Sequence, residues 1–294
     1  MADPVIRGFF DEGTNTVSYF LGDPATRQAA IIDPVLDFDH RTGNAATKSA
    51  DVVLDAAAAA GFDVVRILET HVHADHLSGA PYIKRKTGAP VGIGARVREV
   101  QRIFRPVFNL TDVSGDGSEF DELYEDGAVL LVGSLRVRVM HTPGHTPACV
   151  TYIVDVGNAP YAAFVGDTLF MPDFGTARAD FPGGDAAELY RSIRKVLALP
   201  ETTKLFMCHD YKAPGRENYA WETSVAEERA ANVHVKDGVT EEAFVAMRTA
   251  RDAKLAAPLL LLPSIQVNVR AGKLPAAESN GVRYLKIPVK LTAA

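Results

Sequence analysis

The stretch "ETHVHADHLSGA", residues 69–80, places three histidines and an aspartate within six positions: His71, His73, Asp75 and His76. In an extended segment, residues two apart point to the same side. His71 and His73 can therefore approach one metal ion, with Asp75 continuing the series and His76 facing elsewhere. This arrangement suits two adjacent metal positions. Nitrogen and carboxylate ligands fit zinc or ferrous iron better than magnesium or calcium, which prefer oxygen ligands alone.

Further metal-competent residues lie at the ends of predicted strands. Apolar, β-branched runs between turn signals predict strands at residues 17–21, 28–33, 64–70, 136–142, 149–154, 161–167 and 204–210. His71, His145, Asp167 and His209 each lie at or just beyond the C-terminal end of such a run. Strand ends and their loops are where an α/β scaffold presents chemistry, so we expect these residues to converge on one edge.

Helical patterns lie between some of these strands. They cover residues 49–62, 94–104, 184–199 and 221–233, and Asp185 opens the third. The chain is therefore predicted to be a mixed α/β protein with helices in its outer layers. Beyond residue 212 no long helical domain with paired basic residues is evident, and residues 262–275 and 280–290 are predicted to be extended.

Composition narrows the class of protein. The chain has 294 residues, a net charge of −6, no apolar run long enough to span a membrane and no secretory signal pattern. The negative net charge argues against nucleic acid as a partner, and the negative charge together with the lack of a long apolar run argues against a membrane. Cys149 and Cys208 lie in apolar runs and are predicted to be small buried residues in a reducing compartment. We expect a cytoplasmic protein that acts on a small molecule.

"THVHADH", followed in order by "PGHT", "GDTLF" and "CHDY", resembles the metallo-β-lactamase superfamily over about residues 15–212. The resemblance implies an αββα sandwich of two mixed β-sheets flanked by helices. It also implies a single domain over residues 1–294, with 213–294 as a C-terminal extension packed on it. The superfamily's first metal position would use His71, His73 and His145, its second Asp75, His76 and His209, with Asp167 bridging. His40, His141 and His234 match no ligand position.

Within the superfamily the chain is more similar to the persulfide dioxygenases, through "DEGTNTVSYFLGDP", "AAIIDPV", "TARADF", "HDYK" and "TSVAEERAAN". That resemblance implies one Fe(II) per chain, held by His71, His145 and Asp167. His73, Asp75, His76 and His209 would then orient the ligands and shape the pocket. The implied reaction joins glutathione persulfide, O2 and water to give sulfite and glutathione.

The same resemblance suggests groups that bind the thiol. Arg178 and Tyr211 match positions that face the glutathione site in related enzymes, and Lys212 and Arg216 are further candidates. The segment from Asp167 to Arg178 is longer than in mammalian-type relatives, so the pocket near Met171 to Phe174 is expected to differ in shape.

Two other functions remain open. A glyoxalase II-type thioester hydrolase would use the same seven side chains for two zinc or mixed metal ions, with a bridging hydroxide as nucleophile. A non-enzymatic persulfide or metal sensor would usually carry a regulatory module, and none is evident. For the enzyme we expect a homo-oligomer, a dimer or a tetramer.

Overall fold

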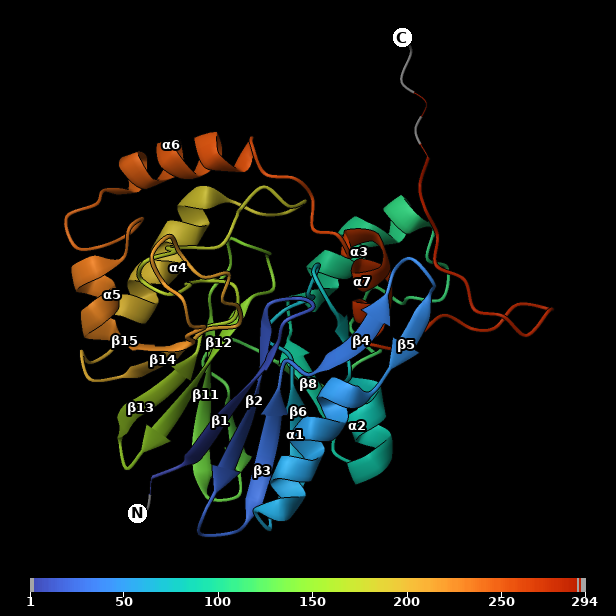
Figure 1. Ribbon diagram of the computed structural model, residues 1–294, viewed down its shortest axis with the longest axis horizontal. Coiled ribbons are helices and arrows are strands. Elements are labelled where there is room, and N and C mark those ends of the chain that lie inside the picture. Colours follow the sequence, from blue (N-terminus) through green and yellow to red (C-terminus); the bar gives the residue numbers. More distant parts are fainter. Residues whose placement is uncertain (1–2, 290, 292–294) are drawn as a thin grey trace.

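Two six-stranded sheets pack against each other between layers of helices in the computed structural model, which describes residues 3–289 and residue 291 (Figure 1). The first sheet has the order β1-β2-β3-β6-β8-β9, the second the order β10-β11-β12-β13-β14-β15, and a small sheet the order β5-β4-β7. Both large sheets mix parallel and antiparallel pairs, such as β3 with β6 and β11 with β12. The predicted αββα sandwich is confirmed.

The strands of the first sheet are Val5–Asp11 (β1), Thr16–Asp23 (β2), Gln28–Ile32 (β3), Asp63–Leu68 (β6), Val91–Gly94 (β8) and Glu122–Tyr124 (β9). Those of the second sheet are Val129–Val132 (β10), Leu135–His141 (β11), Val150–Val156 (β12), Ala159–Phe164 (β13), Lys204–Phe206 (β14) and Glu222–Ser224 (β15). The small sheet contains Val35–Asp39 (β4), Asn44–Ala46 (β5) and Leu77–Ser78 (β7). The helices are Lys48–Ala59 (α1), Ala80–Thr87 (α2), Val97–Phe108 (α3), Ala186–Leu197 (α4), Val225–Ala231 (α5), Glu241–Asp252 (α6) and Leu261–Asn268 (α7).

Strand β2 shows why the layers form. All eight of its residues are buried, because both of its faces are covered. Val17, Tyr19 and Leu21 enter the core between the two sheets, whereas Phe20 points to the core beneath α1, α2 and α3. A third core lies between the second sheet and the helices α4 and α6. The α4 helix begins as predicted, since the Asp185 side chain accepts a hydrogen bond from the Glu188 amide.

The C-terminal part of the chain differs from the sequence prediction. Most of the helix α7, Leu261–Asn268, falls in the segment 262–275 that was predicted to be extended, and α6 packs against α4. Pro263 is compatible with α7 because it lies in the first turn, where a backbone N–H is not needed. Between residue 280 and residue 289 the described residues form no strand. None of the helices in the described residues is both long and apolar enough to span a bilayer.

Candidate metal centre

Seven metal-competent side chains lie in loops that follow strands. They come from the loop between β6 and β7, the loop between β11 and β12, and the turns after β13 and β14. Strand β6 belongs to the first sheet, β7 to the small sheet, and β11 to β14 to the second sheet, so the site lies where the ends of the two large sheets meet. Asp75 is partly exposed and the other six are buried. In chain order the residues are His71, His73, Asp75, His76, His145, Asp167 and His209.

One group consists of His71, His145 and Asp167. One side-chain donor atom from each lies within 4.8 Å of the other two. The Asp167 Oδ2 atom is 3.4 Å from His145 Nε2 and 3.9 Å from His71 Nε2. Two imidazoles and one carboxylate at this spacing can occupy one face of an octahedral ferrous ion and leave positions open for other ligands.

His209 lies at the other oxygen of the same aspartate. His209 Nε2 is 3.3 Å from Asp167 Oδ1 and 3.3 Å from Asp75 Oδ2. His73, Asp75 and His76 form a second group whose donor atoms lie within 4.8 Å of one another. Asp167 therefore contacts the first group through Oδ2 and His209 through Oδ1, and His209 in turn contacts Asp75 of the second group.

Five buried side-chain atoms that could bind a metal ion have no hydrogen-bond partner among the described residues. They are His71 Nε2, His73 Nδ1, His76 Nε2, Asp167 Oδ1 and His209 Nε2. Buried polar atoms are normally paired, because leaving them unpaired costs free energy. Four imidazole nitrogens and one carboxylate oxygen turned toward one region form the donor set that iron or zinc takes. The residues present therefore fit a metal centre.

Two of the imidazoles at the site, those of His145 and His209, are held in place by a hydrogen bond at Nδ1, the ring nitrogen that faces away from the other metal-competent side chains. His145 donates through Nδ1 to the Arg178 carbonyl at 2.8 Å, and His209 donates through Nδ1 to the Asn15 carbonyl at 3.1 Å. Such bonds fix the ring orientation and leave Nε2 as the free donor for a metal. Burial lowers the pKa of His71 well below its usual value, so this ring is neutral and can bind a metal through Nε2.

Asp33 anchors the first half of the histidine-rich loop. It accepts hydrogen bonds from the Thr70 amide at 2.7 Å and the Thr70 hydroxyl at 2.8 Å, and it lies 3.0 Å from His73 Nε2. Burial acts to raise the pKa of Asp33, but the charge of His73 and the hydrogen bonds outweigh it and the pKa is lowered. For His73, Asp33 and Glu69 outweigh burial and raise the pKa. His73 therefore turns Nε2 toward these carboxylates and Nδ1 toward the metal centre.

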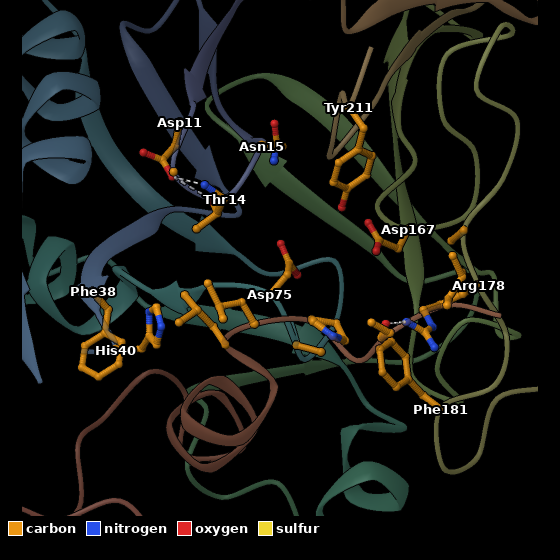
Figure 2. Close-up of a pocket in the computed structure, with 18 of the residues that line it drawn as sticks. Asp11, Thr14, Asn15, Phe38, His40, Asp75, Asp167, Arg178, Phe181 and Tyr211 are labelled. Carbon is orange, nitrogen blue, oxygen red and sulfur yellow. Dashed lines mark hydrogen bonds between the residues drawn. The ribbon is translucent and has the colours of Figure 1, made fainter. Parts of the chain in front are cut away.

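A cleft of about 930 Å³ opens beside these residues. Figure 2 shows Asp75 and Asp167 facing into it, with Tyr211 close to Asp167 and His40 and Phe38 near the opposite side. Phe170 and Phe174 also line the cleft, so the segment expected to alter the pocket shape does contribute apolar side chains to it. The cleft can therefore bring a ligand with both polar and apolar parts next to the metal-competent residues.

The four predicted thiol-binding residues are placed differently. Arg178 and Tyr211 line the cleft, but the Arg178 guanidinium already pairs with both oxygens of Asp180, at 2.6 and 2.8 Å. Among the described residues that line the cleft, Lys212 and Arg216 are absent. The Lys212 ammonium lies 4.2 Å from the Tyr219 ring centre. Arg216 pairs with Asp210 at 2.6 Å and with Asp173 at 2.7 Å.

Sequence reasoning missed one wall of the cleft. Arg248 and Arg251 from α6, and residues 255, 256 and 258–260 between α6 and α7, line it together with the exposed His40. Arg248 is ion-paired with Asp252, whereas Arg251 has no side-chain hydrogen bond or ion pair within the part of the chain that the structure describes. The C-terminal part therefore carries two arginines on a helix beside the cleft, which the sequence pattern did not indicate. No local pattern marks Arg251 as a cleft residue.

Residues predicted to be structural are consistent with that role. Cys149 and Cys208 are buried, and burial raises the pKa of the Cys149 thiol to about 12. His141 and His234 bind backbone groups, the Pro147 carbonyl at 3.0 Å and the Thr176 amide at 3.1 Å.

Several known proteins are similar to this chain. It is 57% identical to a "Probable metallo-hydrolase" of Burkholderia pseudomallei, over 97% of this chain and 98% of that protein. It is 49% identical to "Glyoxylase B2" of Dictyostelium discoideum, over 91% and 90%. The human "Persulfide dioxygenase ETHE1" is 29% identical, over 70% and 68%. The chain spans 65% of the length of a longer relative, the "Beta-lactamase hydrolase-like protein" of Xylella fastidiosa, at 51% identity over 97% of this chain.

A solved structure and a family model agree with these relatives. The crystal structure of ETHE1 from Myxococcus xanthus superposes with a TM-score of 0.72 at 30% identity, covering 92% of this chain and all of that one. The model of the metallo-beta-lactamase superfamily matches residues 12–209, which include all seven metal-competent residues. The chain therefore belongs to the metallo-beta-lactamase superfamily.

Proposed function

We propose that this chain is a persulfide dioxygenase that converts glutathione persulfide, O2 and water to glutathione, sulfite and two protons. One Fe(II) per chain would be held by His71, His145 and Asp167. The observation that carries this proposal is the grouping of two imidazoles and one carboxylate within 4.8 Å at the edge of the cleft. The similarity to a persulfide dioxygenase and to the ETHE1 structure supports the same reading.

Iron bound there would supply the redox chemistry of the reaction. The protein's part is to hold the ligands and to orient the substrate. The Arg178 carbonyl and the Thr70 hydroxyl lie at the outer ring nitrogens of His145 and His71, at 2.8 and 3.0 Å. Because Cys149 and Cys208 are buried and do not line the cleft, the proposal needs no protein thiol. Positioning of the two reactants accounts for the protein's contribution to rate.

Glutathione carries two carboxylates, and we propose that cleft residues bind them. Arg178 and Tyr211 remain candidates because both line the cleft. Arg251 is the stronger candidate for a carboxylate, since its guanidinium is not already paired with an acid among the described residues, whereas Arg178 is paired with Asp180.

The alternative is a glyoxalase II-type thioester hydrolase with two zinc or mixed metal ions. The unpaired Nε2 atoms of His76 and His209 favour it, because a second ion would give both a partner. Two relatives also carry the names metallo-hydrolase and Glyoxylase B2. Arg248 and Arg251 on the C-terminal helix α6 line the cleft, and basic residues on a C-terminal helix are compatible with this alternative too.

One experiment separates the two functions. The protein would be purified anaerobically, its metal content measured, and oxygen uptake with glutathione persulfide followed beside hydrolysis of lactoylglutathione. We expect one iron per chain and oxygen uptake. Two metal ions per chain, with hydrolysis and no oxygen uptake, would refute the dioxygenase proposal.

Two matched variants test the ligand assignment. Asp167→Ala removes the carboxylate that contacts His145 and His209 and should abolish iron binding. His76→Ala removes a side chain of the second group alone and should leave iron binding largely intact. Loss of metal from both variants would favour the dinuclear alternative.

We further propose that residues 213–289 form an extension packed on a single domain; residues 290 and 292–294, included in the sequence prediction, lie outside the described residues. The cytoplasmic location and the dimeric or tetrameric state remain predictions.

A further inference from the structure

The last residue of helix α7 contacts the histidine-rich loop. The Asn268 side-chain amide donates hydrogen bonds to the His73 carbonyl at 2.9 Å and to the His76 carbonyl at 2.8 Å. Its oxygen accepts a hydrogen bond from the Ser78 amide at 2.9 Å. Asn268 is buried and does not line the cleft. Both of its amide hydrogens are used, and both bind this one loop.

The loop needs partners of this kind because residues 69–76 belong to no helix or strand. Buried backbone groups outside regular structure must be paired by side chains or water. The two halves of the loop are held separately. Asp33 holds the first half through Thr70, and Asn268 holds the second half, where the backbone turns to present Asp75 and His76.

Helix α7 is itself firmly held. Ile265 and Val269 lie in the core beneath the first sheet, and the Val269 carbonyl accepts a hydrogen bond from the Gln101 side chain at 2.9 Å. Just after the helix, Arg270 pairs with Asp112 at 2.7 and 2.8 Å. Asn268 is therefore presented to the loop from a fixed element.

We propose that Asn268 is a positioning residue for the metal centre. It sets the relative positions of His73, Asp75 and His76 through their backbone. Part of the chain beyond the superfamily match, which ends at residue 209, thus completes the site. The proposal does not depend on which reaction the centre carries out, because it concerns the loop itself.

The test uses Asn268→Ala, which removes all three hydrogen bonds. The matched control is Ser264→Ala, which truncates another buried polar side chain of α7, one whose hydroxyl has no partner among the described residues. Cobalt(II) binding would be measured by competition with a chelator, and the coordination geometry by visible absorption. We expect Asn268→Ala to weaken metal binding about tenfold or more and to change the cobalt spectrum, with Ser264→Ala unchanged. Wild-type affinity and spectrum in Asn268→Ala would overturn the proposal.

A second variant separates the hydrogen bonds that Asn268 donates to the loop from the one that it accepts. Asn268→Asp keeps an acceptor for the Ser78 amide but turns a carboxylate oxygen toward the carbonyls of His73 and His76. It should weaken metal binding at least as much as Asn268→Ala does. Metal binding at wild-type strength would show that donation to these carbonyls is not needed.

A measurement on the unaltered, metal-free protein keeps the proposal testable if a variant fails to fold. Hydrogen–deuterium exchange should show the Ser78 amide protected as strongly as amides in the adjoining sheets, because a buried acceptor holds it. Exchange as fast as in an exposed loop would overturn the proposal. Both readouts are independent of oxygen uptake, so failure of the dioxygenase assignment would leave this result intact.

Discussion

Replacing Gly144 by alanine should disturb the metal centre through the backbone. Gly144 precedes His145 and has φ of +136°, a conformation that residues with a side chain rarely adopt. A Cβ placed there would lie 2.3 Å from the backbone nitrogen and 2.3 Å from the Cα atom of Leu189, in α4. The Gly144 carbonyl also accepts a hydrogen bond from the Asp185 amide at 2.8 Å, which ties the loop to the start of that helix.

The geometry gives the size of the effect. The contacts at 2.3 Å involve backbone atoms, which cannot rotate away, so the loop or the helix must shift by roughly 1 Å to reach an ordinary contact of 3.4 Å. The positive φ costs about 1–2 kcal/mol and the overlap about 1–3 kcal/mol of folding free energy. A displacement of about 1 Å at a reacting group can cost on the order of a hundredfold in rate. Metal–ligand distances tolerate only about 0.2 Å.

Gly157→Ala is the matched control. Gly157 also has positive φ, +64°, but a Cβ there would meet nothing within 4 Å. The assays are chemical unfolding, metal affinity and oxygen uptake. We expect Gly157→Ala to lose only the backbone contribution of about 1–2 kcal/mol and to keep its metal. We expect Gly144→Ala to lose stability, metal affinity and turnover. If the two variants were equally stable and bound metal equally well, close packing against α4 would not be what positions His145.

Two further predictions concern substrate binding and pH. Arg251→Ala should raise the KM for glutathione persulfide about tenfold or more, because a charge-assisted hydrogen bond to a carboxylate is lost. The KM for cysteamine persulfide, which has no carboxylate, should not change. The control is Lys254→Ala, which makes the same change in charge three residues away, at a residue that does not line the cleft. An equal rise in KM in both variants would contradict a carboxylate site at Arg251. Burial raises the pKa of Glu228 to about 8. Between about pH 4.5 and pH 8 the folded protein therefore holds a proton at Glu228 that the unfolded chain has released, and the free energy of unfolding should fall as the pH rises through this range. Glu228→Gln should remove a decline of a few kcal/mol in unfolding measured across this pH range, and parallel curves for the two proteins would refute the assignment.

The sequence predicted best the parts of the fold that local patterns determine. The strands that became β2, β3, β6, β11, β12, β13 and β14 were recognisable because apolar, β-branched runs lie between turn signals, and in β2, β3 and β12 almost every position is buried. Helix α7 was not recognisable. Its residues "LLPSIQVN" are apolar and polar without a helical period, and tertiary packing against α3 and β7 determines their conformation.

In the candidate site, too, local sequence patterns indicated some residues and not others. Strand ends that meet at one edge predicted that His71, His145, Asp167 and His209 converge, whereas the choice of three of them as iron ligands came from the family resemblance. The partners of Arg216 could not be predicted, since Asp173 lies 43 residues away and nothing local links the two. Arg251 and Asn268 reach the site from the C-terminal helices, and only the folded chain reveals that proximity.

The hydrogen bonds from Asn268 also bear on the kinetics of maturation. They join residues 195 and 192 positions apart in the chain, whereas most of the neighbouring strand pairs are close in sequence. Contacts between distant residues form late, because the entropy of closing a long loop must first be overcome. On refolding from denaturant, far-UV circular dichroism should therefore recover before the capacity to bind cobalt. The rate at which competent enzyme appears is then set by the topology of the chain, and extra metal in the refolding buffer should not shorten the delay.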